Sequence, residues 1–253
     1  MKYINLAKEF EKIFLNKKYF IKYNREKKLD FKNYYNFPRD PDGKVRNLEK
    51  EEKYKLSQIK IIMDYLNKFS NSKKKILDVG CGYGWMLKNL ENKKWKKYGV
   101  EINDYARNIA KKNIQTCKNL ELLKEKDFDV VTMIHVIEHI KEPVSYLKKV
   151  IKLIKKKGIL IIETPDFDSV MARKYNMKFR LLHDKTHISL FSADSIQRLL
   201  VDLGMQILKV EFPYFEGPFF TKKNLLKLLD RNLKISPPFY GSVINIISKK
   251  IDS

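Results

Sequence analysis

The chain has 253 residues and a hydrophobic content of 43%, which is enough for a sizeable core and excludes general disorder. No apolar run reaches the roughly 20 residues that span a bilayer, and the N-terminus lacks the apolar segment of a signal peptide. The two cysteines, Cys81 and Cys117, are too few for a disulfide framework and indicate a cytoplasmic protein. The net charge of +23 suits the binding of a nucleic acid or of a small anionic substrate. Of the 53 basic residues, 45 are Lys and only 8 are Arg, and because Arg is the residue that most often contacts base edges, this ratio disfavours a nucleic acid.

The first 70 residues are predicted to form a helical cap and a loop that precede the main domain, residues 71–253. Apolar residues recur at helical spacing over residues 2–22, which predicts a first helix. Prolines, Asp and Gly between residues 38 and 43 indicate a loop. A second helix is predicted over residues 48–69, where acidic residues in the first turn complement the helix dipole.

From residue 75 onward, apolar runs of strand type alternate with helical stretches. The predicted strands are 75–79, 97–102, 128–134, 159–163, 206–212 and 242–248, and the predicted helices are 84–92, 103–112, 143–154 and 193–203. Pro143 suits the first turn of a helix and Gly158 its end, while Ser192 and Gly204 suit the two ends of the last helix. Residues 165–191 and 213–240 are predicted insertions. This alternation predicts a parallel sheet covered on both faces.

The most informative motif lies where the first strand of this alternating region ends. Gly80, Gly82 and Gly84 have the spacing G-x-G-x-G, whereas dinucleotide enzymes have G-x-G-x-x-G. Glycines let the backbone turn tightly and approach a ligand at the carboxyl edge of a parallel sheet. Asp78 precedes the loop and can meet an ammonium group, and Glu101 ends the next strand and can accept both hydroxyls of a ribose. An amine at one end and a ribose at the other describe S-adenosylmethionine (SAM) better than NAD.

Residues 70–212 resemble a class I SAM-dependent methyltransferase. Residues 76–84 match the glycine-rich signature of that family, residues 128–140 resemble its fourth strand and the E-H turn that follows, and residues 158–165 resemble its fifth strand. The resemblance implies an α/β fold with a Rossmann-like doubly wound sheet, mostly parallel with an antiparallel last strand, preceded by the helical extension. One departure is the segment 116–121, which has no clear match to the acidic residue that reads the adenine amine in many relatives.

The resemblance also assigns the residues that bind SAM. It implies that the methionine end lies against Asp78, Gly80, Cys81, Gly82 and Gly84, that the ribose and adenine lie against Glu101 and Ile102, and that His135 lies along the cofactor.

All four histidines fall in two pairs at i, i+4 spacing, His135 with His139 and His183 with His187. Methyl transfer to a hydroxyl requires positioning and the removal of one proton, and a neutral imidazole suits the second task. His187, in a segment that resembles the H-x-S-x-F-S sequence of small-molecule methyltransferases, is the first candidate for the base, followed by His183 and His139. A structural role is the alternative for His187 and His139. A divalent metal site that adds Glu138 and Asp184 is a further alternative, which we do not favour.

Motifs for methylation of base amines, cytosine C5 and arginine are absent from the sequence. A small-molecule acceptor remains, an oxygen of a glycan, sugar nucleotide or phosphorylated intermediate, and residues 36–46 resemble a segment of methyltransferases of bacterial surface-polysaccharide biosynthesis. Arg39, Arg46 and Arg180 are candidates for binding an acceptor phosphate or carboxylate. The alternative is an RNA methyltransferase or a basic RNA-binding module. We expect a monomer or a homodimer.

Overall fold

The protein is built around a seven-stranded sheet with the strand order β5-β4-β3-β6-β7-β10-β9. The computed structural model describes residues 14–16, 18–23, 47–69, 74–182, 184, 186–230 and 232–251. The strands of the sheet are β3 Lys74–Val79, β4 Trp95–Val100, β5 Gln115–Cys117, β6 Phe128–Ile134, β7 Ile154–Pro165, β9 Met205–Glu211 and β10 Val243–Lys250. The pairs among β3 to β7 are parallel, whereas β10 runs antiparallel to both β7 and β9. The predicted mixed sheet with an antiparallel last strand is confirmed.

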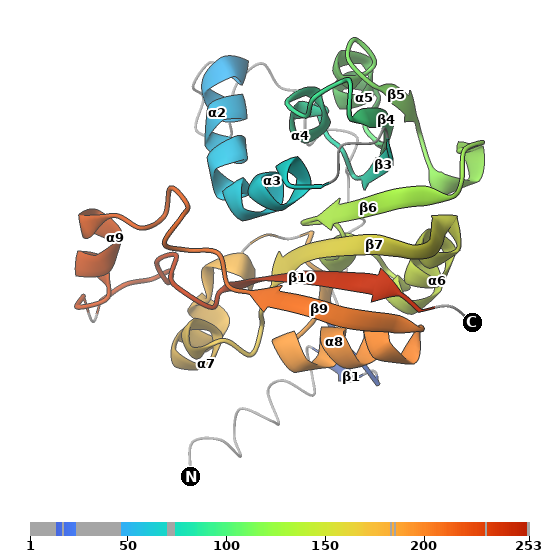
Figure 1. Ribbon diagram of the computed structural model, residues 1–253. Coiled ribbons are helices and arrows are strands. Elements are labelled where there is room, and N and C mark those ends of the chain that lie inside the picture. The colour runs from blue at the N-terminus through green and yellow to red at the C-terminus, as the bar shows by residue number, and fades with distance from the viewer. Residues whose placement is uncertain are drawn as a thin grey trace.

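Helices cover both faces of this sheet (Figure 1). They are α2 Leu48–Gln58, α3 Lys60–Asn67, α4 Trp85–Lys88, α5 Asp104–Ala110, α6 Pro143–Leu153, α7 Val170–Tyr175, α8 Ala193–Asp202 and α9 Lys222–Lys227. In the part of the chain that the structure describes, none of them combines the length and the apolar character needed to cross a bilayer.

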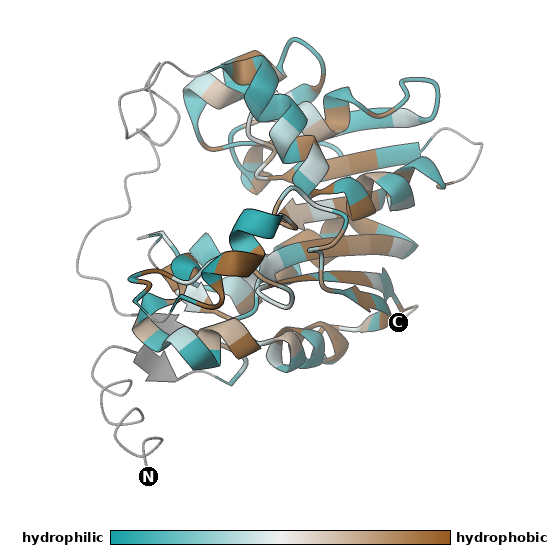
Figure 2. Ribbon diagram, turned by 90° about the vertical axis from the view of Figure 1, so that its left-hand side faces the viewer, coloured by the Kyte–Doolittle hydropathy of each residue, from teal (hydrophilic) through white to brown (hydrophobic). Residues whose placement is uncertain are grey.

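The core consists of two apolar layers, one on each face of the sheet. Leu147 of α6 and Leu199 of α8 are buried in the layer on one face. Leu66 of α3 and Leu87 of α4 are buried in the layer on the other. Figure 2 shows the same pattern, with apolar residues concentrated along the central strands. Because each buried Leu contributes roughly 1.5–3 kcal/mol relative to an exposed one, the two layers fix the sheet between its helices.

Several predicted helices differ from the structure at their boundaries, and the helices predicted over residues 84–92 and 103–112 are observed as the shorter α4 and α5. The helix predicted over residues 48–69 is observed as α2 and α3, which are separated at Ile59. The third helix of the alternating region begins at Pro143 as predicted, but it ends at Leu153, so the prediction that Gly158 ends it is wrong. Gly158 lies inside β7, where a Cβ would come within 2.9 Å of the Phe128 carbonyl oxygen, and its role is to allow the close approach of two strands.

The N-terminal segment forms strands where the sequence predicts a helix. β1, Phe14–Asn16, pairs antiparallel with β2, Ile21–Tyr23, which pairs in turn with β8, Ser189–Leu190. The predicted helix over residues 2–22 is therefore wrong in these two stretches, and residues 1–13 lie outside the described residues. Phe20 is buried against Phe191 with ring centroids 5.6 Å apart, so a contact with a distant part of the chain overrides the helical spacing.

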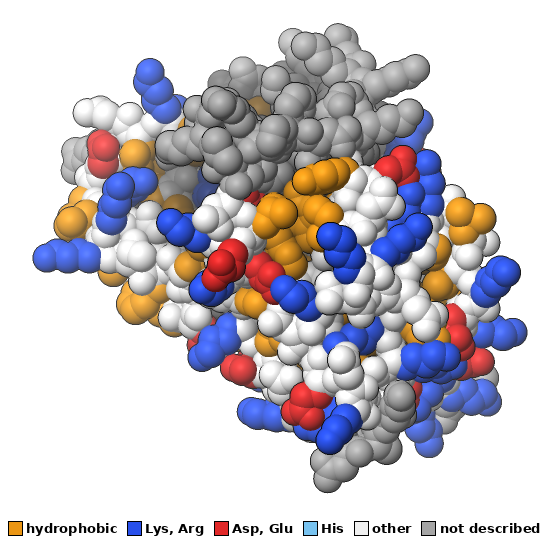
Figure 3. All heavy atoms as spheres, turned by 90° about the horizontal axis from the view of Figure 1, so that it is seen from above, with side chains coloured by type: hydrophobic (Ala, Val, Ile, Leu, Met, Phe, Trp, Pro, Cys, Tyr) orange, Lys and Arg blue, Asp and Glu red, His pale blue; other side chains and the backbone are white. Residues whose placement is uncertain are grey.

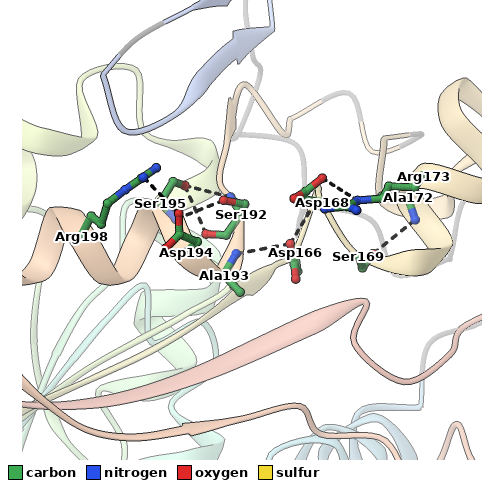
Figure 4. Close-up of polar contacts among 10 residues, drawn as sticks. All are labelled: Asp166, Asp168, Ser169, Ala172, Arg173, Ser192, Ala193, Asp194, Ser195 and Arg198. Carbon is green, nitrogen blue, oxygen red and sulfur yellow. Dashed lines mark hydrogen bonds and ion pairs between the residues drawn. The ribbon is translucent and has the colours of Figure 1, made fainter. Parts of the chain in front are cut away.

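A polar network fixes the insertion after β7 beside the start of α8 (Figure 4). Oδ1 of Asp166 accepts hydrogen bonds from the backbone N–H groups of Asp168 at 2.9 Å and Ala193 at 3.3 Å. Ser192 caps α8 as predicted, and it forms a reciprocal capping box with Ser195. These contacts hold the first turn of α8 against the carboxyl end of β7, the edge of the sheet where the candidate site lies.

Candidate active site

The loop that follows β3 contains three glycines in a left-handed backbone conformation. The φ angles of Gly80, Gly82 and Gly84 are 77°, 52° and 75°, which residues with a Cβ rarely adopt. At Gly80 a Cβ would also lie 2.4 Å from Cγ2 of Val136. The N–H of Gly80 donates to the carbonyl of Val100 at 2.7 Å, which ties the loop to the end of β4. The spacing G-x-G-x-G thus produces the tight turn at the sheet edge that the sequence predicts.

Glu101 follows β4 and holds the same loop from the other side. Its Oε2 accepts the N–H of Gly82 and its Oε1 accepts the N–H of Asn103, both at 2.8 Å. Each carboxylate oxygen has two lone pairs, so each keeps the capacity to accept one ribose hydroxyl. Glu101 is 5% exposed and burial raises its pKa, while the two backbone donors lower it. The neighbouring Ile102 is 59% exposed and offers an apolar surface beside this carboxylate.

Asp78 lies at the end of β3, buried beneath the glycine loop. Its Oδ1 accepts the hydroxyl of Thr132 at 2.7 Å. Burial raises the pKa of Asp78 to about 7, the hydrogen bond from Thr132 opposes that shift, and the charge of Glu101 adds to it. Cys81 is buried nearby, and burial raises the pKa of its thiol, which therefore stays neutral. A carboxyl group in this state is stabilised as a carboxylate when an ammonium group approaches.

These residues fit SAM on the chemistry of the donor set. Asp78 offers a carboxylate for the ammonium, Glu101 offers free lone pairs for the ribose hydroxyls, and the three glycines form a tight left-handed turn beside them. The carboxylate pair and the exposed Ile102 lie on neighbouring strands, at the edge where ligands of open parallel sheets bind.

His135 lies at the end of β6, between two buried glutamates. Its Nδ1 is 3.1 Å from Oε1 of Glu138, and its Nε2 is 3.1 Å from Oε1 of Glu163. The backbone of His135 has a φ of 53°, and its N–H donates to the Glu163 carbonyl at 2.8 Å. Burial lowers the pKa of His135, but the hydrogen bonds and charges of both glutamates outweigh it and raise the pKa to about 9. His135 is therefore an imidazolium at neutral pH and donates to both carboxylates.

His139 and His187 lie together beside Glu138, with ring centroids 4.9 Å apart. Nδ1 of His139 is 3.0 Å from the Thr186 carbonyl oxygen, and Nδ1 of His187 is 2.6 Å from the Leu181 carbonyl oxygen. His187 is buried, and burial lowers its pKa, so it is a neutral imidazole that donates to the carbonyl of Leu181. This anchoring suits the structural alternative for His187, and its role as a base stays a prediction.

Glu138, His139 and His187 also form a cluster that could hold a metal ion. Each offers one ligand atom, and these atoms lie within 4.8 Å of one another. Two imidazole nitrogens and one carboxylate are a donor set that Zn²⁺ and other transition metals accept. Glu138 has protein partners on both oxygens, because Oε1 faces His135 and Oε2 accepts the Thr164 hydroxyl at 3.0 Å. Hydrogen bonding therefore explains the buried carboxylate, and the metal site stays the alternative interpretation.

A pocket opens beside His135, at the carboxyl ends of β6 and β7, which point toward α2 and α7 in Figure 1. Its walls come from distant segments of the chain and include Gln58, Arg180, Tyr214, Phe219, Phe239 and Ser242. The guanidinium of Arg180 lies over the ring of Phe219, 5.4 Å from its centroid. Burial lowers the pKa of Arg180, and the described residues include no carboxylate at ion-pair distance from it. An arginine of this kind is suited to an anionic ligand.

Three residues that line this pocket also carry buried polar atoms without hydrogen-bond partners among the described residues. They are Oε2 of Glu163, the hydroxyl of Tyr214 and Oγ of Ser242. Leaving such an atom unpaired costs about 1–3 kcal/mol, which a bound polar ligand recovers. Sequence reasoning missed all three residues. Only Glu163 carries a signal, because it is the single charged residue between Gly158 and Pro165.

The remaining predicted site residues are Arg39, Arg46 and His183, which lie outside the described residues. Of the predicted acceptor-binding arginines, Arg180 is the one that the structure places at the pocket.

A family model described as a methyltransferase domain matches residues 51–210. An uncharacterized protein of Methanocaldococcus jannaschii is 30% identical over 197 residues, which are 74% of this chain and 74% of that protein. The ubiquinone biosynthesis O-methyltransferase of Pelagibacter ubique is 30% identical over 141 residues, which are 49% of this chain and 58% of the enzyme. The ubiquinone biosynthesis O-methyltransferase of Nitrosomonas europaea is 25% identical over 136 residues, which are 49% of this chain and 56% of the enzyme. The chain thus spans just over half the length of these two enzymes.

Solved structures share the fold. A SAM-dependent methyltransferase of Thermotoga maritima aligns with a TM-score of 0.55 and 21% identity over 80% of this chain and 95% of that one. The magnesium protoporphyrin IX methyltransferase of Synechocystis, solved with bound S-adenosylhomocysteine, aligns with a TM-score of 0.58 and 16% identity over 83% and 90%. With its sheet order, its glycine loop and a family match over more than half of its length, the chain belongs to the class I SAM-dependent methyltransferases.

Proposed function

We propose that the protein transfers the methyl group of SAM to an oxygen of a small anionic acceptor. The observation that carries this proposal is Arg180, a half-buried cation at the wall of the pocket beside His135. A guanidinium binds a carboxylate or a phosphate through two parallel hydrogen bonds, and the guanidinium of Arg180 lies over the ring of Phe219.

Within this proposal Asp78, the glycine loop and Glu101 hold SAM, which supplies a sulfonium methyl group when bound. Asp78 binds the ammonium and Glu101 the ribose, and Ile102 packs on the adenine. The chain then has to position the acceptor oxygen and remove its proton, because SAM is already an activated electrophile.

The acceptor class that fits is a glycan precursor, a sugar nucleotide or another phosphorylated intermediate, of the type used in bacterial surface-polysaccharide biosynthesis. The relatives named ubiquinone biosynthesis O-methyltransferases support an oxygen as the methyl acceptor. α2 contributes Gln58 to the pocket, so this helix takes part in the proposed acceptor site. On the face in Figure 3, lysines and arginines are interspersed with acidic and neutral side chains, which favours a small molecule over RNA.

Incubation with labelled SAM and a panel of glucose 1-phosphate, UDP-glucose, 3,4-dihydroxybenzoate and a single-stranded RNA tests the proposal. We expect label in a small anionic compound, and Arg180→Ala should raise the KM for that compound by about tenfold or more, since a charge-assisted hydrogen bond contributes about 1.5–3 kcal/mol. Arg180→Lys keeps the charge but lacks the two parallel N–H donors of the guanidinium, so it should restore only part of the acceptor affinity that Arg180→Ala loses. Transfer of label to RNA alone would contradict the proposal.

A further inference from the structure

Glu163 is a charged residue near the end of β7, directly after a run of four apolar residues. Residues 159–162 of β7 are buried aliphatic side chains, and Glu163 itself is only 2% exposed. Its side chain shares a face of the sheet with Ile161, the face covered by α3 and α4. A buried carboxylate is costly unless it is paired, so its surroundings must supply compensation.

The close polar contact of this carboxyl group is made by one of its two oxygens. Oε1 of Glu163 is 3.1 Å from Nε2 of His135, and His135 is held from behind by Glu138 at 3.1 Å. Lys55 of α2 adds a second positive charge within electrostatic range of Glu163. Oε1 of Glu163 is therefore oriented by a His135 ring that Glu138 itself holds in place.

The other carboxylate oxygen, Oε2, is buried and has no hydrogen-bond partner among the described residues. Glu163 lines the same pocket as Arg180, which has no carboxylate partner within the described chain. An unpaired acceptor and an unpaired cation thus line one pocket. A ligand that complements both has a hydroxyl at one end and an anionic group at the other.

We propose that Oε2 of Glu163 is the base that takes the proton of the acceptor hydroxyl while Arg180 holds the anionic end of the acceptor. This inference rests on the proposed transfer of a methyl group to a small anionic molecule. In the step, the acceptor oxygen forms a bond to the methyl carbon, the bond between that carbon and sulfur breaks, and its electron pair stays on sulfur. The hydroxyl proton passes to Oε2, which leaves Glu163 as a neutral carboxylic acid until it releases the proton to solvent.

This assignment differs from the imidazole base that the sequence predicts. His187 is buried, its Nδ1 is engaged with the Leu181 carbonyl at 2.6 Å, and it is not among the residues that line the pocket. Glu163 has a free oxygen and lines the pocket. In this arrangement His135 and Glu138 are positioning residues, because they orient the carboxyl group of Glu163.

Glu163→Gln tests the proposal, since it keeps the shape of the side chain and removes its basicity. The probes are 3,4-dihydroxybenzoate, whose hydroxyls are protonated at neutral pH, and 4-nitrocatechol, whose more acidic hydroxyl is already largely ionised. We expect kcat for the first probe to fall by about 100-fold or more, and kcat for the second to stay near that of the wild type. A merely structural role would reduce both equally.

Glu211→Gln is the matched control. Glu211 lies in the same row of the sheet, because Asn245 of β10 pairs with both Glu163 and Glu211, and its Oε2 is likewise buried without a partner. It does not line the pocket, so its substitution should leave kcat for both probes unchanged. SAM affinity, measured by calorimetry, should be unaffected by Glu163→Gln.

Three outcomes would overturn the inference. Undiminished turnover of 3,4-dihydroxybenzoate by Glu163→Gln would exclude Glu163 as the base and leave the proposed function standing. A parallel loss of SAM affinity would place Glu163 in the cofactor site instead, again without affecting the proposed function. A wild-type protein that methylates no small acceptor would overturn the proposed function and this inference with it.

Discussion

At the scale of single residues, Gly80 combines two requirements that can be separated by experiment. Its φ of 77° disfavours any residue with a Cβ, and that Cβ would also overlap Val136 at 2.4 Å. We predict that Gly80→Ala weakens SAM binding by about tenfold or more, because the loop must move away from the strand ends. We also predict that it lowers the free energy of unfolding by more than the roughly 1–2 kcal/mol expected for an Ala in the left-handed conformation. Calorimetry and chemical denaturation measure the two effects.

Gly204 provides the control for Gly80. It has a φ of 81°, but a Cβ at this position meets no atom within 4 Å. Gly204→Ala should therefore show the backbone cost alone and leave SAM affinity unchanged. Equal effects of the two substitutions on SAM affinity would mean that the glycine loop does not contact the cofactor.

Asp78 makes both stability and SAM binding depend on pH, in opposite directions. Folding raises its pKa from 3.8 to about 7, so between these values the folded protein binds more protons than the unfolded chain. The contribution of Asp78 to stability therefore falls as pH rises through this window. SAM requires the carboxylate, so we predict that its affinity falls as pH drops below about 7, by up to about tenfold per pH unit. Calorimetry across this range is the measurement.

Asp78→Asn separates this effect from other titrating groups. The variant should bind SAM weakly at every pH, and it should lose the part of the pH dependence that Asp78 causes, both in binding and in unfolding. Glu101 titrates nearby with a raised pKa, so any dependence that remains is assigned to it. A wild-type affinity that stays constant across neutral pH would show that Asp78 does not bind the ammonium.

At the scale of elements, α8 depends on a cap at its start. The Ser192 hydroxyl accepts the N–H of Ser195, and the helix buries Ile196, Leu199 and Leu200. We predict that Ser192→Ala lowers the free energy of unfolding by about 1 kcal/mol, because the cap stabilises a helix that the core requires. Denaturant titration measures the change.

Thr221 is the corresponding cap of α9, where its hydroxyl accepts the N–H of Asn224 at 3.2 Å. None of the residues of α9 is buried, so Thr221→Ala should leave the global free energy of unfolding almost unchanged. If Thr221→Ala lowered the free energy of unfolding as much as Ser192→Ala does, the effect of a helix cap on stability would not depend on whether the helix is buried.

The elements also show how far the sequence determines the fold. Strands β3, β6 and β7 could be predicted because they are buried on both faces and appear as short apolar runs. β1 and β2 could not, because β2 lies between β1 and β8, and β8 is more than 160 residues away in the sequence. The cofactor residues Asp78, Glu101 and the glycines form local motifs at strand ends. The pocket residues come from six separate segments, so Tyr214 and Ser242 have no local signal.

At the scale of the whole molecule, the net charge of +23 predicts how the protein responds to salt. A chain so rich in lysine should bind polynucleotides at low ionic strength whatever its function, because each neutralised phosphate releases a counterion. For a single strand the logarithm of the affinity falls with the logarithm of the salt concentration by about 0.7 for each phosphate contact.

A small acceptor held by Arg180 makes one charged contact, whereas RNA spread over a surface of lysines makes many. We predict that raising the salt concentration to the physiological range abolishes binding of a fluorescent poly(U) strand, measured in an anisotropy titration. The same change in salt should alter the KM for a small anionic acceptor by only about twofold or threefold. The dispersed lysines of Figure 3 give the reason, since binding without a focused patch depends on the summed field of the protein. Tight poly(U) binding at physiological salt, together with inhibition of small-molecule methylation by poly(U), would show that the basic surface is part of the substrate site.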